Sequence, residues 1–187
     1  MAITAQLVKE LRDMTAAGMM DCKKALVEVE GDLEKAVDWL RQKGMAKAAK
    51  KSGRATSEGL VTVAATADNM HIAMGSLLCE TDFVARGDQF QAMATRVTQV
   101  ILEKAPADAA ALEVLLGEEV TQLIASVGEN MQLGKFARFS KKSANDVVGQ
   151  YVHANSKIGV LVYLTCGKAG TGQEPRHAGC RRQPPGP

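Results

Sequence analysis

Three short helical patterns at the start of the chain, separated by glycines, constrain its fold most strongly. Apolar residues recur at helical spacing in each pattern, and Thr4 and Asp32 are suited to cap the first and third helices. The glycines that end the three patterns are Gly18, Gly31 and Gly44. Helices this short are not stable alone. Residues 1–44 are therefore predicted to form a three-helix bundle with one core, in which Leu11 and Met14 share an apolar face.

Beyond residue 58 the sequence changes to the patterns of strands and longer helices. The predicted strands are residues 59–63, 71–78, 131–139, 147–153 and 158–164. The predicted helices are residues 89–102 and 112–127, the second interrupted at Gly117 and ended by Gly128. Short turns such as residues 155–157 join the later strands. This order predicts an α+β core over residues 59–166 with a largely antiparallel sheet.

The composition is that of an ordinary globular protein. The chain has 187 residues, a formal net charge of +2, and 46% hydrophobic and 24% charged residues. It has no apolar run long enough to cross a bilayer and no secretory signal at its start, so we expect a cytoplasmic protein without a membrane partner. The four cysteines include no CxxC pair and no histidine at ligand spacing. We expect reduced thiols, no metal site and no cofactor.

Residues 45–58 are predicted to be a basic linker between the bundle and the core. The run from Lys43 to Arg54 contains neither an acidic nor an aromatic residue. Proteins that bind single-stranded nucleic acids interleave basic residues with aromatic ones. A solvated linker or the polar face of a helix is therefore favoured. Nonspecific RNA binding stays as an alternative, and no specific nucleic-acid partner is expected.

Residues 79–84, Cys-Glu-Thr-Asp-Phe-Val, place Asp82 beside Phe83 where a predicted strand passes into a predicted helix. Backbone at such a transition holds side chains outward and often carries function. An alternative interpretation makes Phe83 a hydrophobic staple, packed against its own helix. The residues of this loop alone favour the staple.

Three motifs closely resemble those of bacterial elongation factor Ts. The first is Leu11-Arg12 followed by residues 15–26, Thr-Ala-Ala-Gly-Met-Met-Asp-Cys-Lys-Lys-Ala-Leu. The second is residues 79–86, Cys-Glu-Thr-Asp-Phe-Val-Ala-Arg. The third is Tyr151-x-His153 followed by residues 158–162, Ile-Gly-Val-Leu-Val. The three occur in the family's order over residues 1 to about 165, which makes the resemblance specific.

The resemblance implies a guanine nucleotide exchange factor whose partner is elongation factor Tu. The bundle would have a ubiquitin-associated-like fold and dock on the GTPase domain of Tu. Its implied docking residues are Met19, Met20, Asp21, Cys22 and Lys23. The implied magnesium-disturbing residues are Thr81, Asp82, Phe83 and Val84, with Phe83 as an exposed wedge and Asp82 beside it. The third motif implies the core residues His153 and Gly159. The resemblance implies no catalytic residue. It also reverses the preference between the two interpretations of Phe83, so that an exposed wedge is favoured over a hydrophobic staple.

Two positions depart from the family's pattern. Where the family usually has an acid and an Asn before the second motif, this chain has Ser76 and Leu78. Where an Arg pair often precedes the strand that contains residues 136–139, this chain has Gly134 and Lys135. These departures bear on how the strands present the loop.

Residues 167–187 do not resemble the family. They contain no large apolar residue and four of the five prolines, so they are predicted to be disordered. When the codons that could encode this tail are read one nucleotide later, they allow a different amino-acid sequence. That sequence resembles the helix that normally follows at this point in elongation factor Ts. We hypothesise a frameshift near Gly167, which would leave the sheet incomplete at its C-terminal end.

Two other functions are consistent with the sequence. An enzyme would use Cys79 or Cys22 as a nucleophile and His153 as its base. A plain binding module would dock on elongation factor Tu through the bundle without efficient nucleotide exchange.

Overall fold

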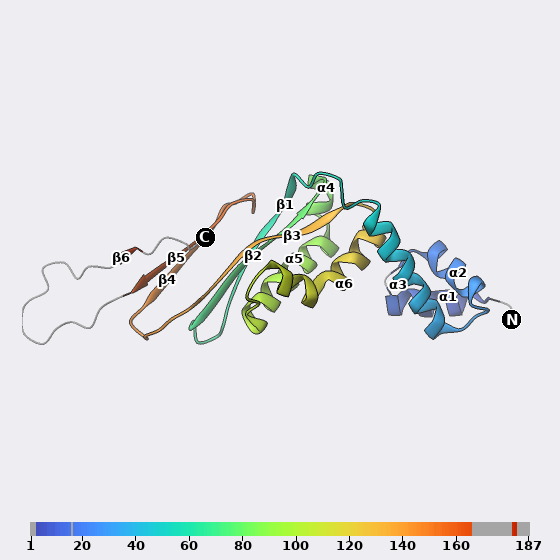
Figure 1. Cartoon of the computed structure of the whole chain (residues 1–187), viewed down its shortest axis with the longest axis horizontal. Coiled ribbons are helices and arrows are strands. Elements are labelled where there is room, and N and C mark those ends of the chain that lie inside the picture. Colours follow the sequence, from blue (N-terminus) through green and yellow to red (C-terminus); the bar gives the residue numbers. More distant parts are fainter. Residues whose placement is uncertain (1–2, 16, 166–180, 183–187) are drawn as a thin grey trace, which may run out of the picture.

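The computed structural model describes residues 3–15, 17–165 and 181–182. Figure 1 shows the elements as successive layers: the helical bundle, helices α5 (Asp88–Lys104) and α6 (Ala109–Val127), one three-stranded sheet, and a second sheet beyond it. All strand pairs are antiparallel. The predicted α+β class is therefore confirmed, although the strands divide into two sheets instead of one.

The bundle comprises α1 (Ala5–Thr15), α2 (Met19–Glu28) and α3 (Leu33–Ala49). Both predicted caps form: Thr4 Oγ1 accepts from the Leu7 amide at 3.2 Å, and Asp32 Oδ1 accepts from the Lys35 amide at 3.1 Å. The buried core of the bundle consists of Val8, Leu11, Cys22, Ala25, Leu26 and Ala36. The prediction that Met14 belongs to this core is wrong, because its side chain is 60% exposed.

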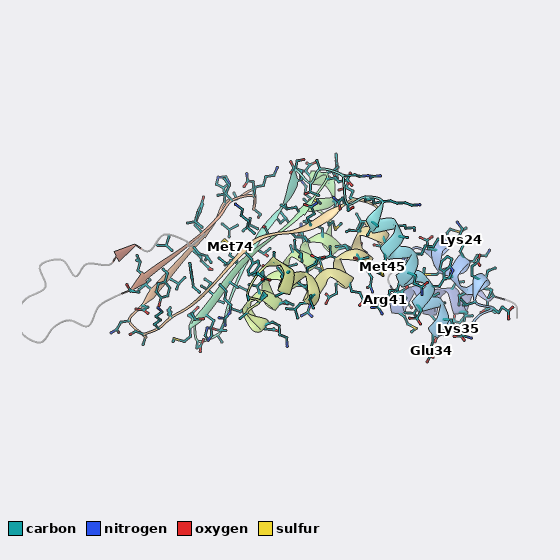
Figure 2. All side chains as sticks on the ribbon, in the orientation of Figure 1. Lys24, Glu34, Lys35, Arg41, Met45 and Met74 are labelled. Atoms are coloured by element: carbon teal, nitrogen blue, oxygen red, sulfur yellow. The ribbon has the colours of Figure 1, made fainter. Side chains whose placement is uncertain are left out.

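Helix α3 does not stop at Gly44 as predicted but continues to Ala49. The residues after Gly44 are mostly alanine, methionine and lysine, which favour helix. Packing against α6 (Ala109–Val127) adds support, since a Cβ placed at Gly44 would lie 3.5 Å from the Cβ of Ala125. Arg41, labelled in Figure 2, also forms a two-pronged ion pair with Glu118 of α6 at 2.9 and 3.0 Å. The N-terminal half of α3 thus belongs to the bundle and its C-terminal half to the core.

The first sheet has the order β1-β2-β3, with β1 at Glu58–Ala65, β2 at His71–Cys79 and β3 at Met131–Ser140. Helix α5 (Asp88–Lys104) covers one face of this sheet. Its predicted apolar stripe is buried as expected, with Phe90, Val97 and Ile101 in the same core as Leu77. The register between β2 and β3 shifts because β3 has one extra residue opposite Ser76, and the Ser76 hydroxyl donates to the Lys135 carbonyl at 2.9 Å.

Helix α6 is continuous through Gly117, so the predicted interruption is wrong. A glycine inside a helix costs only about 1 kcal/mol relative to alanine. That cost is offset by the buried stripe of Leu112, Leu116, Val120 and Ile124, which lie one turn apart and pack into the core. The predicted end at Gly128 is confirmed, with φ of 92° in the left-handed region.

The second sheet contains β4 (Val147–Val152), β5 (Gly159–Thr165) and β6 (Arg181–Arg182), with β5 in the middle. It lies on the face of the first sheet opposite α5, and Figure 2 labels Met74 between the two. The Val61 amide donates to the Ser156 carbonyl at 2.6 Å across this junction. The His153 amide donates to the Ile158 carbonyl at 2.9 Å, which confirms the predicted turn.

Strand β6 lies in the segment that was expected to be disordered. Its backbone pairs with Leu164 and Thr165, because a sheet edge offers unpaired amides and carbonyls to any chain that reaches it. For these two residues the expectation of disorder is wrong. The rest of that expectation and the frameshift hypothesis fall on residues 166–180 and 183–187, which lie outside the described residues.

We predict that Gly159→Ala destabilises the contact between the sheets. A Cβ at residue 159 would lie 2.6 Å from Val61 Cγ1 and 2.5 Å from Met74 Sδ, so at least one neighbour must move. Overpacking of this kind costs about 1–3 kcal/mol. Urea unfolding measures the loss. The matched control is Gly149→Ala in β4, where an added Cβ meets nothing within 4 Å. Equal stability of the two variants would contradict the close approach at Gly159.

Candidate functional site

The loop at residues 81–84 follows β2 and begins the single-turn helix α4 (Asp82–Ala85). Thr81 is the N-cap, and its hydroxyl accepts from the Val84 amide at 3.4 Å. Val84 packs against the core and Ala85 is buried, whereas Phe83 is 82% exposed. A staple would be packed against its helix, so the structure contradicts that interpretation of Phe83. The turn presents an uncovered aromatic ring to solvent.

Asp82 occupies the first position of α4, next to Phe83. Its carboxylate forms an ion pair with Arg86 one turn later, at 3.0 Å. The Arg86 side chain is 79% exposed and the Asp82 side chain 46%, so this pair contributes little to stability.

Thr81 is held by two residues outside the turn. Glu129 Oε2 accepts from the Thr81 amide at 3.0 Å, and Glu129 Oε1 accepts from the Thr81 hydroxyl at 2.6 Å. The thiol of Cys79 donates to the Thr81 carbonyl at 3.2 Å. The backbone that carries Phe83 is thus fixed at its starting residue.

A second network lies beside the first. Glu80 Oε1 accepts from the Asn130 amide at 2.6 Å and lies 3.4 Å from Arg54. The buried Asn130 side chain donates to the carbonyls of Arg54 and Ser52, at 2.8 and 3.4 Å. These contacts join three loops: the one after α3, the one after β2 and the one after α6. They also tie down part of the segment that was expected to be a solvated linker.

No motif or periodic pattern of the sequence singles out Glu129 and Asn130. The only local signal is their position directly after Gly128, which ends α6 and allows the chain to turn back toward the sheet. Their partners lie about 50 residues earlier in the sequence. No spacing rule connects residues so far apart, so only the folded chain shows the contact.

The predicted docking residues of α2 do not share one environment. Met19 and Met20 are 50% and 66% exposed, and Lys23 is also exposed. Asp21 pairs with Lys47 of α3 at 2.8 Å, and this bond lowers the pKa of the Asp21 carboxyl. Cys22 is completely buried, so it supports the bundle's core and has no surface for a partner. The exposed members leave a small apolar and basic surface.

The basic run is largely used within the protein. Lys43 lies 3.9 Å from the centre of the Trp39 ring, and Lys47 pairs with Asp21. Lys51 donates to the Ile124 carbonyl at 3.5 Å, and its burial lowers its pKa. Three lysines of the run thus interact within the protein, whereas Lys50 is exposed.

The enzyme hypothesis finds no support in the geometry. Cys79 is completely buried, and burial, with the carboxylates of Glu129 and Glu58, raises its pKa to about 11. His153 lies in the exposed connection between β4 and β5, where its Nδ1 is 3.0 Å from Asn155 Oδ1. Gly159 lies near this connection and allows the sheets to approach. His153 of the third motif therefore lies on the surface, whereas Gly159 lies at the contact between the sheets.

A cleft of about 460 Å³ lies between the bundle and α6, with Met14, Asp21 and Met45 among its walls. None of the residues that line it belongs to the loop at 81–84. Among the residues that the structure describes, no group of three or more His, Cys, Asp and Glu side chains is arranged to hold a metal ion. Within the same ranges, no helix has the length and apolar content needed to cross a membrane.

These features define an α+β protein with a helical bundle and a separate, anchored aromatic loop. A family model described as elongation factor TS matches residues 80–175, which include this loop. A relative from Desulfovibrio desulfuricans named elongation factor Ts is 78% identical over 174 residues, 93% of this chain and 61% of that protein. Relatives of the same name from Nitratidesulfovibrio vulgaris and Symbiobacterium thermophilum are 47% and 48% identical, over 97% and 87% of this chain.

The chain belongs to the elongation factor Ts family. It spans 61% of the length of the Desulfovibrio and Nitratidesulfovibrio relatives and 53% of the Symbiobacterium one.

We predict that Cys79 resists alkylation in the folded protein. A pKa of about 11, against the ordinary 9.0, lowers the thiolate fraction at pH 8 about 100-fold, and burial also blocks the reagent. Iodoacetamide labelling at pH 8, followed by peptide mass spectrometry, measures the rate with and without denaturant. The substitutions Cys166→Ser and Cys180→Ser remove two of the other thiols, and the peptide analysis distinguishes Cys79 from Cys22. Equal labelling of Cys79 in the native and denatured chains would contradict its burial.

Proposed function

We propose that this protein is a guanine nucleotide exchange factor for elongation factor Tu and acts in translation elongation in the cytoplasm. The observation that carries the proposal is Phe83, an 82% exposed aromatic side chain on an anchored turn. An aromatic side chain held out on an anchored turn can supply a large, rigid contact to a partner at low cost in conformational entropy. The turn lies in the region that matches the elongation factor Ts family.

The loop would act at the edge of the nucleotide site of Tu. A bound magnesium ion bridges the nucleotide phosphates to a GTPase and neutralises their charge. Phe83 would wedge between side chains of Tu, and the half-exposed carboxylate of Asp82 would lie near the magnesium ion. Displacing the magnesium removes much of the attraction that holds GDP.

No covalent step is required of this chain. The factor accelerates GDP release when it binds the nucleotide-free form of Tu more tightly than the GDP-bound form. Linkage then requires GDP to weaken the binding of the factor by the same ratio. An aromatic side chain suits this task, since it adds contact area and loses little conformational entropy. We therefore propose an exchange factor without an enzymatic active site.

The bundle would supply affinity by docking on the GTPase domain of Tu. Its exposed Met19 and Met20 offer flexible apolar contacts, and Lys23 adds a positive charge beside them. Asp21 contributes indirectly, because its bond to Lys47 holds α2 against α3. A docking bundle that lacks an effective wedge would be a plain binding module, which is the alternative function.

We expect the parent chain to accelerate the release of a fluorescent GDP analogue from elongation factor Tu, and Phe83→Ala to remove most of that acceleration. Loss of a central aromatic contact costs roughly 2 kcal/mol, which corresponds to about a 30-fold lower rate. Stopped-flow fluorescence measures the release. Val114→Ala is the matched control, since Val114 is 87% exposed but lies on α6. Binding to Tu without accelerated release would instead support the plain binding module.

We also expect Met20→Glu to weaken binding to nucleotide-free Tu about tenfold, because it places a charge in an apolar contact. Met20 is 66% exposed, so the substitution leaves the bundle's core intact. Isothermal titration calorimetry measures the dissociation constant. Val114→Glu puts the same charge on another exposed apolar residue. The Val114→Glu control is expected to bind Tu as the parent chain does. If Met20→Glu also binds as tightly as the parent chain, the proposed docking through α2 is wrong.

A further inference from the structure

We propose that Glu129 is a positioning residue for the exchange loop: its carboxylate sets the direction of the α4 turn and so presents Phe83 to the partner. This inference rests on the proposed function. It assigns a role to a residue outside the three motifs, in the connection between α6 and β3.

The carboxylate of Glu129 matches two donors of one residue. Its Oε2 accepts from the Thr81 amide at 3.0 Å and its Oε1 from the Thr81 hydroxyl at 2.6 Å. Two bonds from one carboxylate fix the orientation of Thr81 as well as its distance. The third polar group of Thr81, its carbonyl, accepts from the Cys79 thiol. All the hydrogen-bonding groups of Thr81 are thus engaged.

The bond to Glu129 also sets the role of the Thr81 hydroxyl in the cap. A hydroxyl has one proton to donate and two lone pairs to accept with. Because the proton points to Glu129, a lone pair is left for the Val84 amide at 3.4 Å. That contact closes the first turn of α4 around Phe83. Glu129 therefore supports the cap through Thr81.

The direction of Phe83 depends on its anchored neighbours. A four-residue helix is not stable alone, and the ring of Phe83 is exposed and so has little packing of its own. Its direction follows from the anchored Thr81 on one side and the packed Val84 on the other. A preorganised loop loses less conformational entropy when it binds, which strengthens the contact.

The test is a double-substitution cycle in GDP release from elongation factor Tu, with Glu129→Ala in the parent and in the Phe83→Ala background. We expect Glu129→Ala to lower the release rate about 10-fold in the parent, since hydrogen bonds to a carboxylate are lost. In the Phe83→Ala background we expect less than about a twofold change, because the side chain that Glu129 positions is gone.

The matched control is Asp146→Asn. Asp146 holds another loop in the same manner, accepting from the Lys142 amide at 3.0 Å and from the Tyr163 hydroxyl at 2.5 Å. If Asp146→Asn slows GDP release through general destabilisation, the fold-change in rate should be the same with and without the Phe83 side chain. Glu129→Gln keeps one acceptor for Thr81, so an intermediate rate is expected. If Glu129→Ala does not fold, as judged by circular dichroism, Glu129→Gln takes its place in the double-substitution cycle.

The outcomes separate the two proposals. If Phe83→Ala slows release but Glu129→Ala and Glu129→Gln do not, the positioning role is wrong and the proposed function stands. Equal losses in both Phe83 backgrounds would also overturn the positioning role, since they indicate only a structural contribution. If Phe83→Ala itself has no effect, the proposed wedge fails whatever Glu129 does.

Discussion

The fold depends on β2, the middle strand of the first sheet, whose two faces are both covered. On one face Ala73 and Leu77 lie in the core shared with α5, and on the other Met74 contacts the β4–β5 hairpin at Gly159. Burial of both faces constrains β2 more than the other strands that the structure describes. The loop at residues 81–84 begins directly after it, so the exposed Phe83 is attached to a well-buried strand.

A second constraint is α3, which belongs to the bundle and to the core. Its pairing with α6 through Arg41 and Glu118, and the close approach of Gly44 to Ala125, give the bundle a defined orientation. The two proposed contact surfaces, on α2 and on α4, are therefore parts of one framework. A partner that meets both surfaces gains from this, because little orientational freedom is lost on binding.

Local patterns predicted the elements well where burial follows regular spacing. The caps at Thr4 and Asp32 and the stripe of α5 were recognisable because each depends on neighbours within a few residues. The predictions failed at Gly44, interpreted as a helix end, and at Gly117, interpreted as an interruption of a helix. Packing against other helices outweighs the small intrinsic cost of a glycine, and such packing leaves no local pattern.

The sequence by itself determined the α+β class, the order of helices and strands, and the motifs of the family, because hydrophobic periodicity and motifs are local properties. Only the tertiary structure decided which motif residues face solvent: Phe83 is exposed, whereas Cys22 is buried. It alone brought Glu129 to Thr81, a contact between loops that are 48 residues apart. The physical reason is that burial and long-range hydrogen bonds depend on which surfaces pack together, and a linear pattern of residues does not specify that packing.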